Sequence, residues 1–380
     1  MSKMKVITCD SYFKIRRFIE LQYKIYKGDP NFVPPLRLMI RQTLTGKNNM
    51  LLANGPHELL LLRKDGKDTA RLLVGIDEKL NEQKGKRQAY ISMFECVEGE
   101  VEAALKILKA AELWAADHGC DQLFGPVSPS GGDDFRGLLI KGYDGPPAMM
   151  NNYNHPWYVD VFTKFGFAKK RDLIGYDIPS DVVPTDKLEK LIPYAMKKYD
   201  YRVDRLNLKD MDKEIKDIQQ LIAEAIPDRW DNQPIPSVED IKKEANSLLP
   251  LIDADLIYIA RANKTNRPIG LVVALPEYNQ VLKHLGGRLF PIGIFKFLFY
   301  KRKITAVRIF IQMVIPEYQR KGVNAAIFFA MMNAAEKKGI VRGDGSAIGE
   351  DNIASKNSVE RIGGKVYRIF RQYEKKIAAS

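Results

Sequence analysis

The residues best suited to chemistry form a short basic turn between an apolar strand and an apolar helix, Gln319-Arg320-Lys321-Gly322. Gly322 stands at the expected start of the helix, where backbone N–H groups have no intrahelical partner and the helix dipole is positive. Glycine also lets the main chain approach an anion closely. The turn therefore indicates a site for a nucleotide-type, phosphate-bearing ligand. A solvated basic pair on a surface turn is the alternative interpretation.

Two elements would hold this turn in place. Residues 307–314 are mostly apolar and β-branched, as a buried strand requires, and Pro316 ends the strand because proline removes a ladder donor. Apolar residues recur at helical spacing from Val323 to Ala334, and Gly339 is the expected end of that helix. The sequence therefore predicts a strand, a turn and a helix in immediate succession.

This arrangement resembles the pyrophosphate loop Q/R-x-x-G-x-G/A of the GNAT family, the acyl-CoA-dependent N-acyltransferases. Gln319 and Gly322 match the pattern, while Asn324 stands where the family usually has Gly or Ala. The resemblance implies that acyl-CoA binds as a co-substrate with its diphosphate on the loop, and that a backbone N–H near residues 313–315 meets the oxyanion of the tetrahedral intermediate. The residues that it assigns to coenzyme binding are Met313, Val314, Ile315, Gln319, Arg320, Lys321, Gly322, Val323, Asn324, Ala325 and Asn352.

A later segment points to the same family. Residues 352–363 have the spacing of the family's N-x-x-A-x-x-x-Y-x-x-x-G-F helix, with Asn352 and Gly363 in matching positions. Val359 replaces the tyrosine that often protonates the leaving CoA thiolate, so that acid role does not carry over. For Asn352, capping of the next helix is the favoured alternative to coenzyme binding.

Size and composition fit a globular protein of two domains. The chain has 380 residues, 45% of them hydrophobic and 28% charged, which excludes disorder and collagen-like structure. Its net charge of +13 favours an anionic partner, and CoA, nucleic acid and anionic lipid headgroups all qualify. Its three cysteines show no ligand spacing and predict no metal site. Because no signal-peptide core or span-length apolar run is found, we expect a cytoplasmic protein.

The chain repeats one order of elements. Each half is expected to contain a strand and a helix, then a hairpin, a central strand and a long helix. The hairpins are expected at 58–63 with 69–77 and at 257–262 with 269–275, the central strands at 89–97 and 306–314, and the long helices at 101–118 and 322–338. We therefore expect a mixed-sheet α/β fold of two tandem GNAT-like domains, 1–180 and 197–380, joined by a linker and connecting helix at 181–196.

Only the second domain is expected to bind CoA. The corresponding turn of the first half reads Glu95-Cys96-Val97-Glu98-Gly99-Glu100 and lacks the Q-x-x-G pattern. Its acidic residues should repel a diphosphate.

Three residues are candidates for catalysis, His155, Tyr153 and Glu350. His155 and Tyr153 belong to a loop, 125–158, that is longer than a connection needs, as is typical of binding loops. His155 could take the proton from an ammonium nucleophile before the amine attacks the thioester, although a His before Pro is also a common structural hydrogen-bonder. Glu350, expected beside the acyl-transfer cleft, is the rival base. In the same loop, Asp133 and Asp134 could bind an amine.

Residues 281–303 place an apolar body between two basic clusters and are too short to span a bilayer. One interpretation is an interfacial element among anionic headgroups at the inner face of the membrane. The other is an insertion buried against the first domain.

Taken together, these features resemble bacterial GNAT-like proteins, some of them associated with sphingolipid N-acylation. The resemblance implies an acyl-CoA-dependent N-acyltransferase whose acceptor is a small-molecule or lipid amine, such as a long-chain sphingoid base. A non-catalytic acyl-CoA sensor or scaffold is the alternative from another class. Nucleic-acid binding rests on net charge alone, and the one form kept is the use of aminoacyl-tRNA by a Fem-like transferase.

Overall fold

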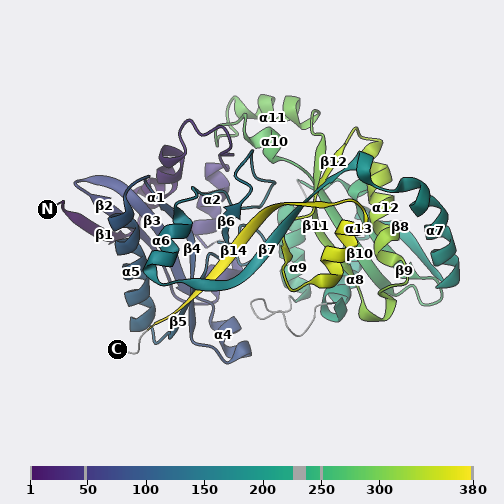
Figure 1. Cartoon of the computed structure of the whole chain (residues 1–380), viewed down its shortest axis with the longest axis horizontal. Coiled ribbons are helices and arrows are strands. Elements are labelled where there is room, and N and C mark those ends of the chain that lie inside the picture. The colour runs from purple at the N-terminus through teal and green to yellow at the C-terminus, as the bar shows by residue number, and fades with distance from the viewer. Residues whose placement is uncertain (1, 47–48, 226–236, 249–250, 378–380) are drawn as a thin grey trace. The chain divides into compact units, whose positions relative to one another are not determined.

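The computed structural model describes residues 2–46, 49–225, 237–248 and 251–377, which form two compact units (Figure 1). Unit 1 comprises Met1–Ile174, Asn279–Arg302 and Tyr367–Ser380, and unit 2 comprises Gly175–Tyr278 and Lys303–Val366. Each unit thus combines segments that are distant in the sequence. The contiguous domain boundaries expected above stay a prediction, because compactness in the fold and repetition along the chain are different properties.

Unit 1 is a twisted sheet with helices on both faces. Its strands are β1 (Met4–Thr8), β2 (His57–Lys64), β3 (Lys67–Ile76), β4 (Gln88–Cys96), β5 (Gln122–Gly125), β6 (Leu138–Lys141), the start of β7 (Ala168–Pro179) and the end of β14 (Lys365–Lys376). Its helices are α1 (Tyr12–Ile25), α2 (Arg37–Leu44), α3 (Met50–Ala53), α4 (Glu78–Lys84), α5 (Val101–Asp117), α6 (Tyr158–Phe165), α10 (Asn279–Leu282) and α11 (Gly293–Lys301).

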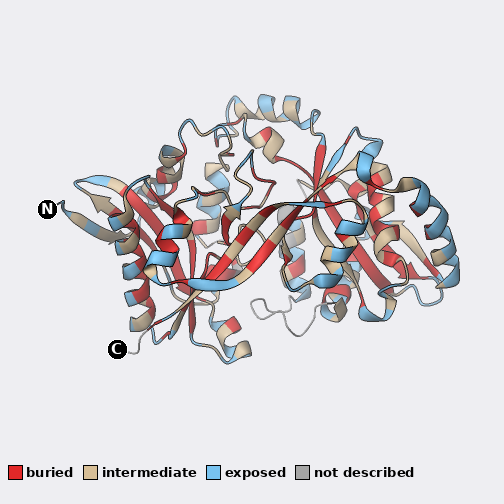
Figure 2. Cartoon of the chain, in the orientation of Figure 1, coloured by how far each residue is buried: buried red, intermediate tan, exposed pale blue. Residues whose placement is uncertain are grey.

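The strands of unit 1 run antiparallel from β1 to β4, β5 pairs parallel with β4, and the end of β14 pairs antiparallel with β5 and β6. Successive side chains of a strand point to opposite faces, so each face packs its own helix. Leu60 and Leu62 belong to the cluster that buries α5, whereas Leu59 and Leu61 belong to the cluster that buries α1. Figure 2 shows the central strands as buried and the outer faces of the helices as exposed.

Unit 2 repeats this plan. Its strands are the end of β7, β8 (Tyr201–Arg205), β9 (Ile257–Ala262), β10 (Pro268–Pro276), β11 (Ala306–Val314), β12 (Arg342–Asp344), β13 (Ile348–Gly349) and the start of β14. Its α-helices are α7 (Thr185–Lys198), α8 (Met211–Ala225), α9 (Val238–Leu248), α12 (Val323–Glu336) and α13 (Ile353–Arg361). The strands from β8 to β11 pair antiparallel, β12 pairs parallel with β11, and β7 pairs antiparallel with β12.

Helices also cover both faces of the unit 2 sheet. Met313 of β11 packs against the apolar cluster of α8 and α9. The neighbouring Gln312 points the other way, since its side-chain amide donates to the Asn324 carbonyl oxygen of α12 at 3.4 Å. Helix α12 therefore lies on the face opposite α8.

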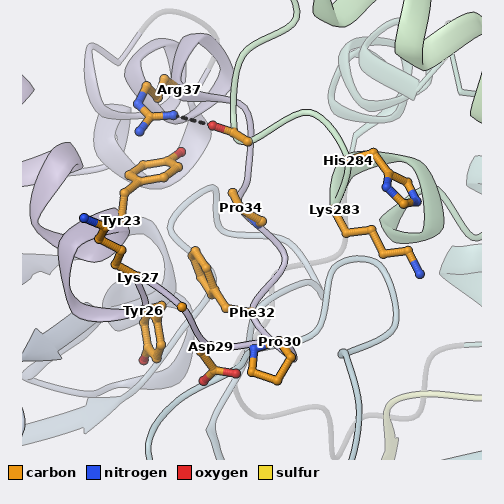
Figure 3. A pocket seen from close by; sticks show the side chains of 12 residues that line it. Tyr23, Tyr26, Lys27, Asp29, Pro30, Phe32, Pro34, Arg37, Lys283 and His284 are labelled. Atoms are coloured by element: carbon orange, nitrogen blue, oxygen red, sulfur yellow. Dashed lines mark hydrogen bonds between the residues drawn. The ribbon is translucent and has the colours of Figure 1, made fainter.

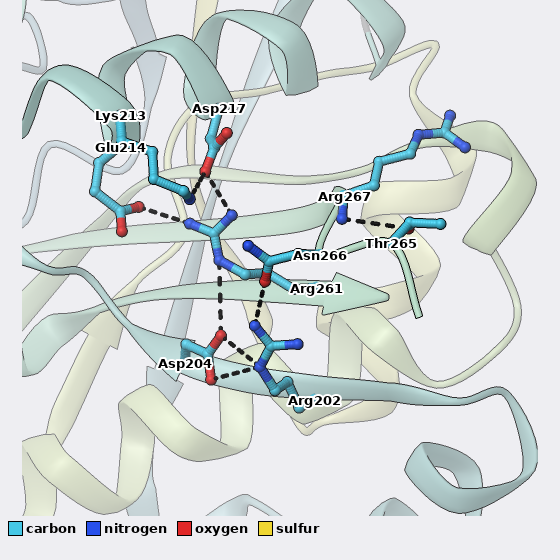
Figure 4. A network of polar contacts seen from close by, with 9 residues as sticks. All are labelled: Arg202, Asp204, Lys213, Glu214, Asp217, Arg261, Thr265, Asn266 and Arg267. Carbon is cyan, nitrogen blue, oxygen red and sulfur yellow. Dashed lines mark hydrogen bonds and ion pairs between the residues drawn. The ribbon is translucent and has the colours of Figure 1, made fainter. Parts of the chain in front are cut away.

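A buried ion network fixes α8 to its sheet (Figure 4). Arg261 of β9 is 3% exposed, and its guanidinium donates to Glu214 at 2.9 Å and to Asp217, both on α8. The carboxylate of Asp204, on β8, lies 3.6 Å from Nε of the same guanidinium. Burial raises the pKa of Glu214, so its charged form depends on the arginine.

The mixed α/β fold expected from the sequence is confirmed. Both predicted hairpins are present as β2–β3 and β9–β10, both central strands as β4 and β11, and both long helices as α5 and α12.

Candidate active site

The candidate site of unit 2 begins at an open edge of the central strand β11. Only its first three residues pair with β12, in the register Ala306↔Arg342, Val307↔Gly343 and Arg308↔Asp344. From Ile309 to Val314 the strand keeps its β10 partner, but in the described part of the chain nothing pairs with its other side. The two parallel strands therefore diverge and leave backbone groups of β11 available.

The direction of these backbone groups follows from one hydrogen bond. The Ile315 N–H donates to the Ile269 carbonyl oxygen at 3.1 Å, so Ile315 faces the β10 side. Because N–H groups alternate along a strand, Met313 also faces that side, whereas Gln312 and Val314 face the open edge. Among residues 313–315, only Val314 therefore has an N–H directed toward a ligand in the opening.

The turn after β11 is shaped for an anion. A short 3₁₀ turn, Pro316–Tyr318, leads to Gly322, whose φ of +80° lies in the left-handed region that favours glycine. A Cβ atom at Gly322 would lie 2.9 Å from the Cβ of Ala195. Gly322 has no side chain to cap the helix, so the N–H groups of Val323, Asn324 and Ala325 retain their capacity to bind a ligand.

Two cations stand beside these N–H groups. Arg320 is exposed, and Lys321 is half-buried with its ammonium 4.7 Å from the centroid of the Tyr318 ring. Gln319 has a different position, because its side-chain amide donates to the Val314 carbonyl oxygen at 3.3 Å. The turn thus combines helix N–H groups with positive side chains, which is the chemistry of a diphosphate site.

The other two predicted residues of unit 2 lie next to α13. The Asn352 side chain accepts the Ser355 N–H at 3.1 Å, so the favoured capping role is confirmed, while coenzyme binding by Asn352 stays a prediction. Glu350 is half-buried, and its backbone carbonyl accepts the Lys356 ammonium at 3.0 Å. Glu350 therefore remains a candidate base in the same unit as the turn.

Known proteins are similar to this chain in sequence or in fold. The chain is 28% identical to Protein YghO of Escherichia coli (strain K12), over 96% of this chain and 93% of that one. It is 26% identical to Bacterial ceramide synthase of Caulobacter vibrioides, over 98% and 97%. A tandem GNAT protein from the clavulanic acid biosynthesis pathway has the same fold with a TM-score of 0.60, at 8% identity and over 100% of both chains.

The chain has the fold of a tandem-domain GNAT protein. This confirms the resemblance found in the sequence, although no family model matches the chain.

The equivalent strand edge in unit 1 is closed. Strand β4 also pairs with β5 only at its first three residues, 88–90. Beyond them, however, the Val127 N–H donates to the Ile91 carbonyl oxygen at 2.9 Å, and the Ser92 hydroxyl donates to the Val127 carbonyl oxygen at 2.6 Å. The segment after β5 therefore covers the edge of β4 at Ile91 and Ser92, and the Cys96 N–H at the end of the strand donates to the Tyr158 hydroxyl at 2.8 Å.

The acidic turn of unit 1 differs in part from the expectation. Glu95 was expected where a diphosphate would bind, but it is 4% exposed and accepts hydrogen bonds from Tyr26 at 2.7 Å and Tyr158 at 2.9 Å. Burial raises its pKa, and Arg71 lies 3.9 Å away as its ionic partner. Glu95 is thus a structural residue, and Glu98 and Glu100 are the carboxylates left in the turn.

His155 and Tyr153 belong to an aromatic cluster of unit 1. The ring of His155 stacks on Tyr26 with centroids 4.7 Å apart, and the Tyr153 hydroxyl donates to Asp29 at 2.7 Å. Burial and the hydrogen bond to Asp29 raise the pKa of Tyr153, which weakens it as an acid. Both residues lie in a different unit from Glu350 and the Gly322 turn.

This cluster adjoins a cavity of about 630 Å³ that sequence reasoning missed (Figure 3). Aromatic rings of Tyr23, Tyr26 and Phe32 form part of its wall. Its other lining residues are Lys27, Gly28, Asp29, Pro30, Pro34, Arg37, Lys283, His284 and Gly286. The sequence clue to this cavity was the helix break at 29–35, which contains three prolines. In the structure an Asx turn, in which the Asp29 carboxylate accepts the Asn31 N–H, shapes this loop.

The two aspartates of the 125–158 loop have local structural roles. Asp133 pairs with Arg136 at 2.8 Å, and Asp134 accepts the Ser130 hydroxyl at 3.2 Å, so both carboxylates serve their own loop. Among the described residues no cluster of His, Cys, Asp or Glu could hold a metal ion, and no helix is long and apolar enough to cross a membrane.

Proposed function

We propose that this protein is an acyl-CoA-dependent N-acyltransferase with its coenzyme site in unit 2. The observation that supports this most is the open edge of β11 leading directly into the Gly322 turn. An extended, amide-bearing chain such as the pantetheine arm of CoA can pair with the open edge of β11 at Gln312, while the diphosphate reaches the N–H groups of residues 323–325. The fold family supplies the donor, since GNAT proteins use acyl-CoA.

The reaction balances without a further reactant. The amine nitrogen attacks the thioester carbonyl carbon, a C–N bond forms, the C–S bond breaks, and CoA leaves as the thiol. The proton lost by the amine passes to a base, for which Glu350 and His155 are the candidates. The Val314 N–H is the backbone donor that we assign to the developing oxyanion.

We propose a lipid amine, such as a long-chain sphingoid base, as the acceptor. The 26% identity to a bacterial ceramide synthase, over nearly both full chains, supports this choice.

The test is to incubate the pure protein with acyl-CoAs of graded chain length and with long-chain and short-chain amines. Release of free thiol is followed together with the mass of the amide product. We expect product from a long-chain amine and little from a short one. If folded protein released no thiol with any pair of acyl-CoA and amine, the proposed acyltransferase activity would be excluded.

Two variants then identify the base. Glu350→Gln and His155→Gln are compared over a range of pH at saturating acyl-CoA. Loss of the base should lower kcat and abolish the alkaline rise of the rate, whereas loss of a packing residue should change stability and leave the pH profile intact.

A non-catalytic acyl-CoA sensor is the second candidate. It is favoured by Val359, which is 7% exposed and packs in unit 2 where the family often has a tyrosine acid. Calorimetry would then detect acyl-CoA binding while no amine released a thiol. The aminoacyl-tRNA alternative would show instead as binding of charged tRNA.

A further inference from the structure

Helix α11 and its flanks expose an unusual amount of apolar surface. No residue of α11 is buried. Five apolar side chains of α11 and the segment before it are exposed, by 67% for Phe290, 68% for Ile292, 72% for Phe295, 56% for Leu298 and 57% for Phe299. Figure 2 accordingly shows this helix without buried residues. Of the two interpretations of this segment, the buried insertion holds for Val281 and Leu285, which are buried in unit 1, but not for α11.

The exposed side chains share one side of the helix. Ile292, Phe295 and Phe299 are three and four positions apart, which aligns them along one stripe, and Leu298 lies next to it. The helix has nine residues and is therefore about 14 Å long. It can lie along a surface but cannot span a bilayer.

The charge around this stripe has one sign. From residue 279 to residue 303 the chain holds six lysines and arginines and no acidic residue. Five of the six lie close to the stripe in sequence, at Arg288, Lys296, Lys301, Arg302 and Lys303. The sixth, Lys283, lines the cavity of Figure 3 together with Lys27. A complementary partner must therefore be apolar at its centre and anionic around it.

We propose that α11 docks unit 1 on the surface of an anionic lipid bilayer. The stripe enters the boundary between headgroups and acyl chains, and the cations contact anionic headgroups. A second copy of the chain is a poorer partner, because two such faces would bring twelve like charges together, twice the six of one segment. The docking concerns where the enzyme meets its lipid, and it does not depend on acyl transfer.

The test is sedimentation of the full-length protein with vesicles of phosphatidylcholine alone or with about 30% phosphatidylglycerol. We expect binding to the anionic vesicles, weakened by salt, and about tenfold or greater loss of binding in the double variant Phe295→Ser with Phe299→Ser. The matched control is Phe13→Ser with Leu113→Ser, since these side chains are 73% and 53% exposed elsewhere on unit 1. The control should bind as the unchanged protein does.

Three results would overturn the proposal. The first is no binding to anionic vesicles, and the second is equal loss in the α11 and control variants. The third is a wild-type dimer that the α11 variant dissociates without any vesicle binding by either protein, which would make this face an interface between copies. Far-ultraviolet circular dichroism confirms that each variant is folded.

Discussion

Two turns of this molecule occupy equivalent places in the two GNAT-like halves and differ in almost every property that concerns an anion. The turn after β11 is basic, has Gly322 at φ +80° and follows an open strand edge. The turn after β4 has Gly99 at φ +79°, but Glu98 and Glu100 flank it and the strand edge is closed by Val127. The left-handed glycine is thus a property of the scaffold, whereas charge and edge closure distinguish a site from its structural copy.

The halves also differ in how a buried arginine is neutralised. Arg261 in unit 2 relies on carboxylates from three positions, while Glu95 in unit 1, the partner of Arg71, keeps neutral donors from two tyrosines and Gln22. We expect Arg261→Met to lower the free energy of unfolding by about 3–5 kcal/mol, because it removes the arginine partner of the buried Glu214 carboxylate. Arg71→Met should lower it by about 1–3 kcal/mol. Denaturant unfolding measures both, and an equal effect would contradict the comparison.

The same variant gives a pH test. Glu214 has its pKa raised by burial from 4.5, and removal of Arg261 takes away the charge that opposes the rise. A folded-state pKa above the unfolded value means that the folded state holds the proton more tightly. The stability of Arg261→Met should therefore fall as pH rises from about 4.5 through the folded pKa. A flat profile would show that Glu214 stays solvated.

The next largest effect tests the anion site itself. Gly322→Glu should weaken CoA binding about 100-fold, or nearly 3 kcal/mol, by adding negative charge where the diphosphate binds. Gly322→Gln is the matched control, since it has the same positive φ and the same contact with the Ala195 Cβ but adds no charge. Calorimetry with CoA should show a smaller loss of affinity for the control. Equal loss in both would indicate that strain, and not the site, controls binding.

Hydrogen exchange can compare the two strand edges directly. The Val127 amide is bonded to Ile91, whereas the Val314 amide faces the opening. We expect the Val314 amide to exchange about tenfold faster than that of Val127 in the free protein, and CoA to slow Val314 alone. A Val314 amide protected without CoA would show that the edge is closed in solution.

The smallest effects concern single hydrogen bonds at each site. Ser92→Ala removes the donor that helps close unit 1, and Asn352→Ala removes the cap of α13. Each should lower the free energy of unfolding by about 1 kcal/mol. Asn352→Ala should also leave CoA affinity unchanged if capping is its whole role, and weaker binding would restore it as a coenzyme contact.

Local features were predictable from the sequence because they depend on neighbours along the chain. The β11 strand, the Gly322 turn and α12 were located from apolar spacing and one glycine, and Asn352 was recognised as a cap. Features that depend on distant neighbours were not. The sequence does not show that Glu95 points inward to Tyr26 and Tyr158. Side chains alternate between the two faces of a regular strand, but the bulge in β4 interrupts this alternation just before Glu95.

The sequence predicted the interleaving of the two units only in part. An insertion against the first domain was one of two interpretations of residues 281–303, and residues 279–302 belong to unit 1. Their placement depends on contacts such as the hydrogen bond of Arg37 to the Gly286 carbonyl oxygen, at 2.8 Å. No periodicity in either segment predicts that contact. The cavity of Figure 3 was missed for the same reason, since its walls come from both segments.

The last strand has a consequence for the order in which the protein can mature on the ribosome. Residues 373–376 of β14 pair with 122–125 of β5, so unit 1 lacks this strand until translation has passed residue 376. The nascent amino-terminal half must then wait with an unsatisfied strand edge, which is a hazard for aggregation. A gene split near residue 190 would therefore divide unit 1 between the two products, because this unit also contains residues 279–302 and the end of β14.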